Sequence, residues 1–405
     1  MRAIAVVAFL AATVSAFGAE DFLDRVDQAL TISTFHDQVR VRISGSLDLE
    51  YYHFPQPPPG LIRATGHDLF NPRLSLFLDA QLGPKVYFFA QTRLDRGFDP
   101  SDIGTQLRLD EFALRVTPWS DGRFNLQVGR FSTVIGGWVE RHLSWENPFV
   151  NAPLPYENVT LVSDSELPQT GQSFRGVPAE DKYEFLPIVW GPVYATGVSA
   201  TGRLNWFEYA VEMKNAALAS RPESWYQRDF DAPAFDLRMG IRPNEAWRFG
   251  FSAAEGPYLR SNAHPLAPEE GGKGVGVNDY RQFVLGQDIS YARGHWQFWA
   301  EAFESRFEEP RLGNVDTLAY YVEAKYKITP QLFGALRWNQ QFFDAGHDAT
   351  GEPVVTPPDL WRIDAALGYR FTAHTQLKLQ YSLARGDFLS NDLGSTFAAQ
   401  FTVRF

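Results

Sequence analysis

Apolar and polar side chains alternate along most of the chain with a period of two residues, and this pattern constrains the fold more than any other feature. The first such segment alternates Val39, Val41, Ile43, Leu47 and Leu49 with Arg40, Arg42, Ser44, Asp48 and Glu50. The last alternates through Phe397, Ala399, Phe401, Val403 and Phe405. Successive side chains of a β-strand point to opposite faces, so the pattern predicts strands with one apolar and one polar face.

Sixteen segments show this alternation. They are 38–53, 72–82, 85–94, 106–117, 123–133, 193–202, 204–214, 234–242, 246–254, 280–292, 295–304, 316–327, 331–342, 361–371, 376–385 and 395–405. Most approach the ~9–11 residues that a tilted strand needs to cross a bilayer. The alternation changes parity near Asp110-Glu111, which predicts a β-bulge there.

The connections between these segments alternate between short and long. The short ones include Gly83-Pro84, Gly202-Arg203, Pro243-Asn244-Glu245, Arg293-Gly294 and Ile328-Thr329-Pro330. The long ones are 54–71, 95–105, 134–192, 215–233, 255–279, 305–315, 343–360 and 386–394. Outer-membrane barrels combine short periplasmic turns with longer outer loops. If the C-terminus is periplasmic, every short turn falls on the periplasmic side.

Composition favours a membrane barrel over a soluble sandwich. Aromatic residues make up 15% of the chain and the mean hydropathy is -0.26. In hydrocarbon only helices and closed barrels satisfy their backbone groups, and the sequence past residue 16 has no run of ~18 apolar residues. Aromatic residues near strand ends resemble an interfacial girdle; they are Phe207, Tyr291, Trp296, Tyr326, Phe371 and Phe405. We therefore predict an all-β, sixteen-stranded antiparallel transmembrane barrel over 37–405, in the cell outer membrane.

The N-terminus has the features of a secretory signal. Arg2 precedes the apolar stretch 3–14, and Val14-Ser15-Ala16 offers small residues at the positions that a signal peptidase recognises. We predict a signal peptide over 1–16, with cleavage after Ala19 as the alternative. In 20–36, Phe22, Val26 and Leu30 recur with helical spacing, which predicts a short periplasmic helix, with a mobile terminus as the alternative.

The polar face of the strands carries many charges of both signs, which need water or partners. Sixteen strands enclose more space than side chains fill, so the interior is expected to hold an aqueous channel. The predicted pore-lining residues are Arg40, Arg42, Arg73, Arg93, Arg108, Asp110, Arg238, Glu323, Arg337, Arg362 and Arg370.

The connection 134–192 is the longest, and a loop of that length is normally functional. In strand count and plan the chain resembles general porins, whose third loop folds inward and narrows the pore. That resemblance implies a constriction formed by Glu140, Arg141, His142, Glu146, Asp164 and Glu166. A loop that caps the outer mouth is the alternative.

Two short runs add to the resemblance. Phe401, Val403 and Phe405 resemble the C-terminal signature that the barrel assembly machinery recognises. Val128-Gly129-Arg130-Phe131-Ser132-Thr133, followed by Gly136, resembles a run of phosphate-selective-porin-like barrels. The dense Lys and Arg ladder of true phosphate channels is not evident, so phosphate specificity is not carried over. The resemblance also implies contact with outer-membrane lipid and lipopolysaccharide, and a homotrimer.

Several classes of function are disfavoured. The chain has no cysteine, which removes thiolate sites and self-attached c-type haem, and no cofactor or metal is expected. The net charge of -11 argues against nucleic acid as a partner. His142 and Ser144 have the H-x-S spacing of outer-membrane phospholipases, with Asn147, Asn151 and Asn158 nearby. In those enzymes, however, the pair lies on a strand of a smaller barrel, so an enzyme is not expected.

The sequence therefore predicts passive diffusion of small hydrophilic solutes or ions through a water-filled pore. One alternative is a barrel that sheathes a separate multihaem cytochrome. Another is a structural anchor with a plugged interior.

Overall fold

Sixteen antiparallel strands close into a ring within the part of the chain that the structure describes. The computed structural model describes residues 19–34, 38–55, 58–64, 66–96, 104–165, 185–227, 229–263, 276–310, 313–344, 359–386 and 393–405. The barrel strands are β2 (Val39–His53), β3 (Asp68–Leu82), β4 (Val86–Asp95), β5 (Gln106–Val116), β6 (Asn125–Phe131), β9 (Ala195–Leu204), β10 (Phe207–Lys214), β11 (Ala234–Ile241), β12 (Trp247–Pro257), β13 (Arg281–Arg293), β14 (Trp296–Glu309), β15 (Gly313–Lys327), β16 (Leu332–Asp344), β17 (Leu360–Arg370), β18 (Thr375–Arg385) and β19 (Gly394–Arg404).

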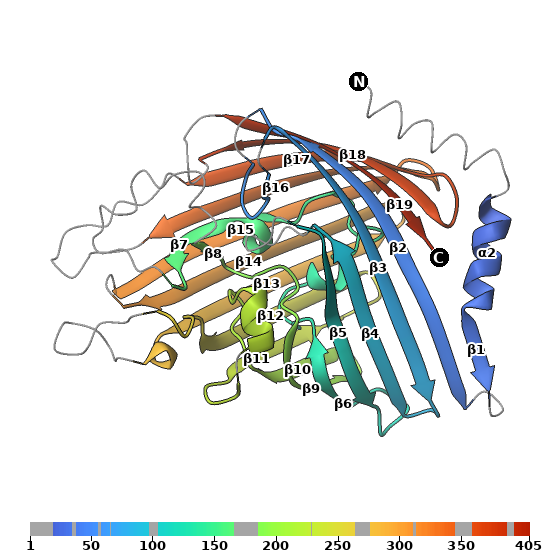
Figure 1. Cartoon of the computed structure of the whole chain (residues 1–405), viewed down its shortest axis with the longest axis horizontal. Coiled ribbons are helices and arrows are strands. Elements are labelled where there is room, and N and C mark those ends of the chain that lie inside the picture. Colours follow the sequence, from blue (N-terminus) through green and yellow to red (C-terminus); the bar gives the residue numbers. More distant parts are fainter. Residues whose placement is uncertain are drawn as a thin grey trace.

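Each barrel strand pairs with its two neighbours, and β19 closes the ring on β2 (Figure 1). Both the predicted fold class and the predicted number of strands are confirmed. The predicted bulge is confirmed as well, because Gln91 pairs with Glu111 whereas Thr92 pairs with Leu109, which leaves Asp110 as the extra residue. Short connections gather at one end of the barrel, called here the turn end, and the long ones at the other, called the loop end.

The outer face of the ring is apolar, as the alternation predicts. Exposed large side chains on it include Leu47, Val211, Leu237, Met239, Phe251, Leu285, Val322, Leu336, Leu367 and Leu379. Aromatic rings collect near the turn end, where Trp247 packs on Tyr291 and Trp296 on Tyr326, each with 4.6 Å between ring centroids. In water this surface would be unfavourable, whereas in a bilayer it meets lipid.

The short elements outside the ring are α2 (Ala19–Ala29), β1 (Thr31–Thr34), the 3-10 helices η1 (Val139–Arg141) and η5 (Val277–Asp279), α3 (Leu154–Glu157), α4 (Pro222–Gln227), and the strands β7 (Val159–Ser163) and β8 (Phe185–Pro187). Among the described residues, no helix is long and apolar enough to cross a membrane.

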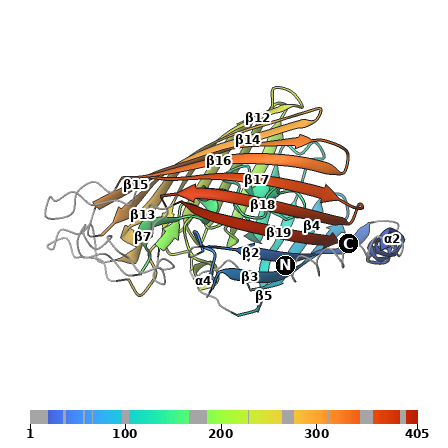
Figure 2. The same ribbon diagram turned by 90° about the horizontal axis from the view of Figure 1, so that it is seen from above.

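The predicted N-terminal helix is shorter than expected, because Thr31–Thr34 form β1. This strand pairs with Val39–Arg42 of β2, whereas β19 pairs with β2 only over Ser46–His53. β1 thus pairs with the part of the β2 edge that β19 leaves unpaired. An exposed strand edge can otherwise pair with other chains. Figure 2 shows α2 beyond the turn end, near the C-terminus. Ion pairs Asp27–Arg42 and Asp24–His374, each at 2.8 Å, hold it there.

The C-terminal residues form the seam of the ring. Phe401 and Val403 lie in β19, and Phe405 exchanges two backbone hydrogen bonds of 2.9 Å with Gly45 of β2. A Cβ atom on Gly45 would lie 2.6 Å from the Phe405 ring, so glycine makes room for this ring. A role for Phe401, Val403 and Phe405 in assembly stays a prediction, as does the signal peptide, since residues 1–18 lie outside the described part.

Candidate functional site

Residues 132–165, the first described part of the connection between β6 and β9, enter the barrel and are called the inserted loop. The Tyr156 hydroxyl donates to Glu301 of β14. Arg141 donates to Glu323 of β15 at 2.7 Å, and the Leu154 amide donates to Asn339 of β16 at 3.2 Å. These partners lie on the inner faces of their strands. Figure 1 accordingly shows β7 and β8 within the outline of the barrel.

Lys378 of β18 holds the middle of the inserted loop. Its ammonium group donates to three loop carbonyls, those of Ser144 at 2.7 Å, Asn147 at 3.0 Å and Phe149 at 2.9 Å. The side chain is fully buried. The neighbouring Gln380 accepts the Val150 amide at 2.7 Å. A buried ammonium needs such partners, so the loop and this lysine depend on each other.

Three of the predicted pore-lining residues lie beneath the inserted loop, and residues of the loop bind each of them, as Arg141 binds Glu323. Arg337 donates to Asp364 at 2.8 Å and to the Asn151 side chain at 2.6 Å. Arg362 donates to Glu157 and to the Ala152 carbonyl. Glu323, Arg337 and Arg362 are at most 2% exposed. They point into the barrel, but the loop separates them from open space.

On the opposite wall, Arg73, Arg93 and Arg108 lie on the adjacent strands β3, β4 and β5 and form what we call the arginine row. Arg93 and Arg108 are direct cross-strand partners, and Ser75 next to Arg73 on the same face pairs with Arg93. Their side chains remain 13–17% exposed. The row lines a cavity of about 180 Å³ that the inserted loop borders from the other side.

Carboxylates behind the arginine row balance its charge. Glu50 lies 3.0 Å from Arg73, Asp95 lies 3.1 Å from Arg108, and Asp110 lies 3.3 Å from both Arg93 and Arg108. These acids are at most 4% exposed. Like charges directly opposite each other in a sheet repel, and the interleaved acids offset that repulsion. Asp95 and Asp110 line the cavity together with the arginines, but the guanidinium groups are the more exposed of the two kinds of charge.

His142 faces the same cavity from the inserted loop. Its Nδ1 lies 2.6 Å from the Val139 carbonyl oxygen, so this nitrogen carries the hydrogen, and Nε2 accepts from the Tyr194 hydroxyl at 2.8 Å. Tyr194 in turn accepts from Arg93 at 3.4 Å. Burial, reinforced by the charge of Arg93, lowers the pKa of His142 to about 4. The imidazole is thus neutral at pH 7, and neither nitrogen is available to activate Ser144.

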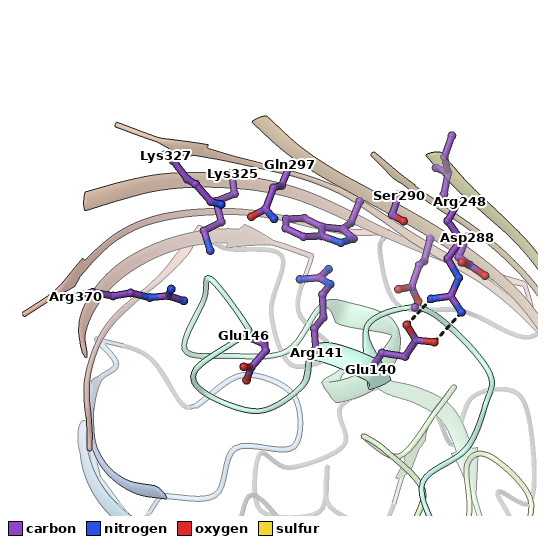
Figure 3. A pocket seen from close by; sticks show the side chains of 14 residues that line it. Glu140, Arg141, Glu146, Arg248, Asp288, Ser290, Gln297, Lys325, Lys327 and Arg370 are labelled. Carbon is purple, nitrogen blue, oxygen red and sulfur yellow. Dashed lines mark hydrogen bonds and ion pairs between the residues drawn. The ribbon is translucent and has the colours of Figure 1, made fainter. Parts of the chain in front are cut away.

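A second cavity, of about 430 Å³, lies toward the turn end (Figure 3). Glu140 pairs there with Arg248, and the Arg238 guanidinium contacts Asp288 at 2.6 Å. Its lining also includes Arg141, Glu146, Lys325, Lys327 and Arg370. Figure 3 shows Glu146 projecting from the loop between Arg370 and Arg141. Carboxylates of the inserted loop and cations of the barrel wall therefore share this cavity.

Two further cavities lie between these regions and share lining residues with them. One, of about 310 Å³, shares Leu143 with the cavity at the arginine row. It shares Phe89, Glu111 and Arg115 with another of about 480 Å³. The latter shares Glu140 and Arg248 with the cavity of Figure 3. The four cavities thus follow one another from Leu61 and Trp225 at the loop end to Gly122 and Arg203 at the turn end.

The remaining predicted site residues are dispersed. Arg40 is exposed near the turn end, and Arg42 is engaged by Asp27 of α2. Asp164, expected in the constriction, is fully buried between Arg221 and Arg260, at 2.9 Å from each. It fastens outer connections to one another and does not face the cavities. Glu166 lies outside the described residues.

Sequence reasoning missed several residues of the passage. Asp95 links Arg73 and Arg108, and its spacing of two from Arg93 could have identified it. Trp225 lines the cavity from outside the alternating segments, so periodicity gave no signal for it. Tyr194 lies in the segment 193–202, but it was not among the predicted site residues.

The glycines of the quoted porin-like run have steric roles. A Cβ atom on Gly129 would lie 2.2 Å from the Phe112 carbonyl oxygen. Gly136 has φ +82°, and its Cβ would lie 2.0 Å from the Tyr156 hydroxyl. Both positions therefore require glycine.

Within the described residues, no group of three or more His, Asp or Glu side chains has a geometry that would hold a metal ion.

Comparison with known proteins finds similarity in structure only. No protein-family model matches the sequence, and no curated protein matches it. The outer-membrane protein OmpT of Vibrio cholerae is similar at 10% identity, with a TM-score of 0.56 over 91% of this chain and 98% of that chain. OmpF of Salmonella typhi, in complex with daunomycin, is similar at 10% identity, with a TM-score of 0.58 over 92% and 100%.

The anion-selective porin from Comamonas acidovorans is similar at 9% identity, with a TM-score of 0.53 over 91% of this chain and 100% of that chain. These values show a shared architecture along nearly the full length of each protein. The chain has the fold of the sixteen-stranded outer-membrane porins.

Proposed function

We propose that the chain forms a water-filled channel in an outer membrane and lets small hydrophilic solutes or ions diffuse through it. The observation that carries this proposal is the series of adjoining cavities between the two ends of the barrel, lined by charged side chains. A charge in a dry interior is costly, and water in such a passage removes that cost. The turn end is then periplasmic and the loop end extracellular.

The inserted loop supports a channel over the two alternatives. Its described residues occupy interior space that a cytochrome inside a sheath would need. A structural anchor needs no series of polar cavities. We further propose that outer-membrane lipid and lipopolysaccharide surround the barrel and that the barrel assembly machinery inserts it. We also propose a homotrimer, because OmpT of Vibrio cholerae occurs in a trimer form.

Reconstitution into a planar lipid bilayer tests the proposal. Folded protein is expected to add conductance in equal steps, one for each inserted channel or trimer. Insertion of folded barrels without any conductance would overturn the channel and favour the anchor. Co-purification of a haem protein that fills the barrel would favour the sheath.

A further inference from the structure

The two sides of the cavity at the arginine row differ in chemistry. One side is the arginine row itself. The other is a chain of rings, called here the aromatic row. Its centroid separations are 4.6 Å from Tyr156 to Trp138, 6.1 Å from Trp138 to His142, 6.1 Å from His142 to Tyr194 and 6.0 Å from Tyr194 to Trp225. All five rings line the cavity.

The arginine side suits an anion. Its guanidinium groups are partly exposed, whereas the acids that balance them are covered. A planar guanidinium presents N–H groups in the geometry that a carboxylate accepts. Asp48, Asp95 and Asp110 also line the cavity, but each is at most 3% exposed, so the guanidinium groups offer a solute more surface on this side than the carboxylates do.

The aromatic side suits an apolar group. Its one acid at this cavity, Glu157, is engaged by Arg362, while Glu140 and Glu146 line the cavity nearer the turn end. His142 donates from Nδ1 to the Val139 carbonyl and accepts the Tyr194 hydroxyl at Nε2, which is the arrangement of a neutral imidazole. Leu61, Ile62 and Leu143 add apolar surface around the rings. Tyr156, Tyr194, Trp138 and Trp225 are at most 5% exposed, so a flat apolar group gains most of its contact area from the partly exposed His142 and Leu143 and from the ring edges beside them.

We propose that this cavity selects small carboxylates that carry a flat apolar or aromatic group, with the carboxylate on the arginine row and the flat group on the aromatic row. The proposal rests on the channel function proposed above. The solutes selected by this cavity are those that contact the arginine row and the aromatic row at the same time.

Interruption of the ionic current by three probes tests the proposal in planar bilayers. Benzoate has both the charge and the ring, acetate has only the charge, and benzyl alcohol has only the ring. Benzoate is expected to interrupt the current at about a tenfold lower concentration than either other probe, because an added ring contact of ordinary strength corresponds to about that factor.

Substitutions separate the two sides. Arg93→Gln is expected to weaken interruption by benzoate and by acetate alike. Because the Tyr194 hydroxyl accepts from Arg93, Tyr194→Phe, which keeps the ring and loses the hydroxyl, is the reference for Tyr194→Leu. Relative to Tyr194→Phe, Tyr194→Leu is expected to weaken interruption by benzoate alone. Tyr381→Leu, on the outer face of β18, serves as the control. If Tyr194→Leu does not fold, Trp225→Leu provides the same comparison.

The outcomes distinguish the two proposals. A wild-type protein that inserts but does not conduct overturns the channel itself. A protein that conducts normally, but that benzoate interrupts no better than acetate does, overturns only the inferred solute class. Equal effects of Tyr194→Leu on benzoate and acetate would also overturn it.

Discussion

Replacing Lys378 with Met is expected to loosen the inserted loop while leaving the barrel intact. Lys378 is fully buried, and its ammonium group donates to three carbonyls between residues 144 and 149. Methionine has a similar length and no donor, so the substitution leaves all three carbonyls without this partner.

The magnitude follows from these contacts. Each buried carbonyl left without its donor costs about 1–3 kcal/mol, so three such carbonyls together give about 3–9 kcal/mol. Met itself avoids the desolvation of a buried ammonium, which favours the lower end. A loss of about 3 kcal/mol corresponds to a factor of about 150 between the docked and the undocked loop. Gln380, Arg337 and Arg362 still hold the loop, so displacement is local and transient.

Single-channel recording in planar bilayers is the assay. The Lys378→Met channel is expected to show larger current fluctuations and additional conductance levels, because the loop borders the passage. Lys85→Met, in an exposed turn at the turn end, is the matched control and should behave as wild type. Folded Lys378→Met protein with a current trace identical to wild type would refute this role of Lys378.

Three further substitutions test other parts of the structure. Asp164→Asn leaves two arginines without their buried carboxylate and should lower the free energy of unfolding by about 3–5 kcal/mol. The control Asp121→Asn, at an exposed ion pair, should change it by less than about 1 kcal/mol. Equal denaturation midpoints of the two variants would contradict a stabilising role of the buried Asp164. His142 takes up a proton near its ordinary pKa of 6.5 in the unfolded chain but only near pH 4 in the folded chain, so stability should fall as the pH drops through this interval. Melting experiments at pH 7 and pH 4.5 should show a smaller fall in stability for His142→Gln than for the wild type. Gly136→Ala forces a Cβ against the Tyr156 hydroxyl and should lower the free energy of unfolding by about 2–4 kcal/mol. The loss should be smaller for Gly83→Ala, whose Cβ would meet nothing within 4 Å. Equal losses in chemical denaturation would contradict a steric requirement for glycine at position 136.

The strands could be predicted from the sequence because their signal is local. Leu237 and Arg238 face opposite sides whichever strands lie beside them, and a period of two records this directly. The bulge at Asp110 was visible for the same reason. The end of the N-terminal helix was not, because Thr31–Thr34 form a strand only where β19 leaves the edge of β2 unpaired.

The candidate site depends on contacts between distant segments, which a local pattern does not contain. Arg73 and Arg337 both lie on the polar face of their alternating segments. One faces the cavity and the other lies beneath the inserted loop, because the loop packs on β14–β18 and leaves β3–β5 open. Asp164 and Glu146 likewise belong to one connection, yet only Asp164 meets arginines from two other connections. The residue type and its place in the two-residue alternation identify which charged side chains point into the barrel. The position of the docked loop then determines which of these side chains line the cavities.

Cysteine modification during current recording tests most directly whether the arginine row faces a conducting passage. The chain contains no cysteine, so single replacements give one defined thiol each. In the Arg73→Cys channel a charged, water-soluble thiol reagent is expected to lower the conductance in one step, whereas Leu237→Cys, on the outer face of β11, should show no change. An unaffected current in a reactive Arg73→Cys protein would contradict the proposed passage, and so would block at Leu237→Cys alone.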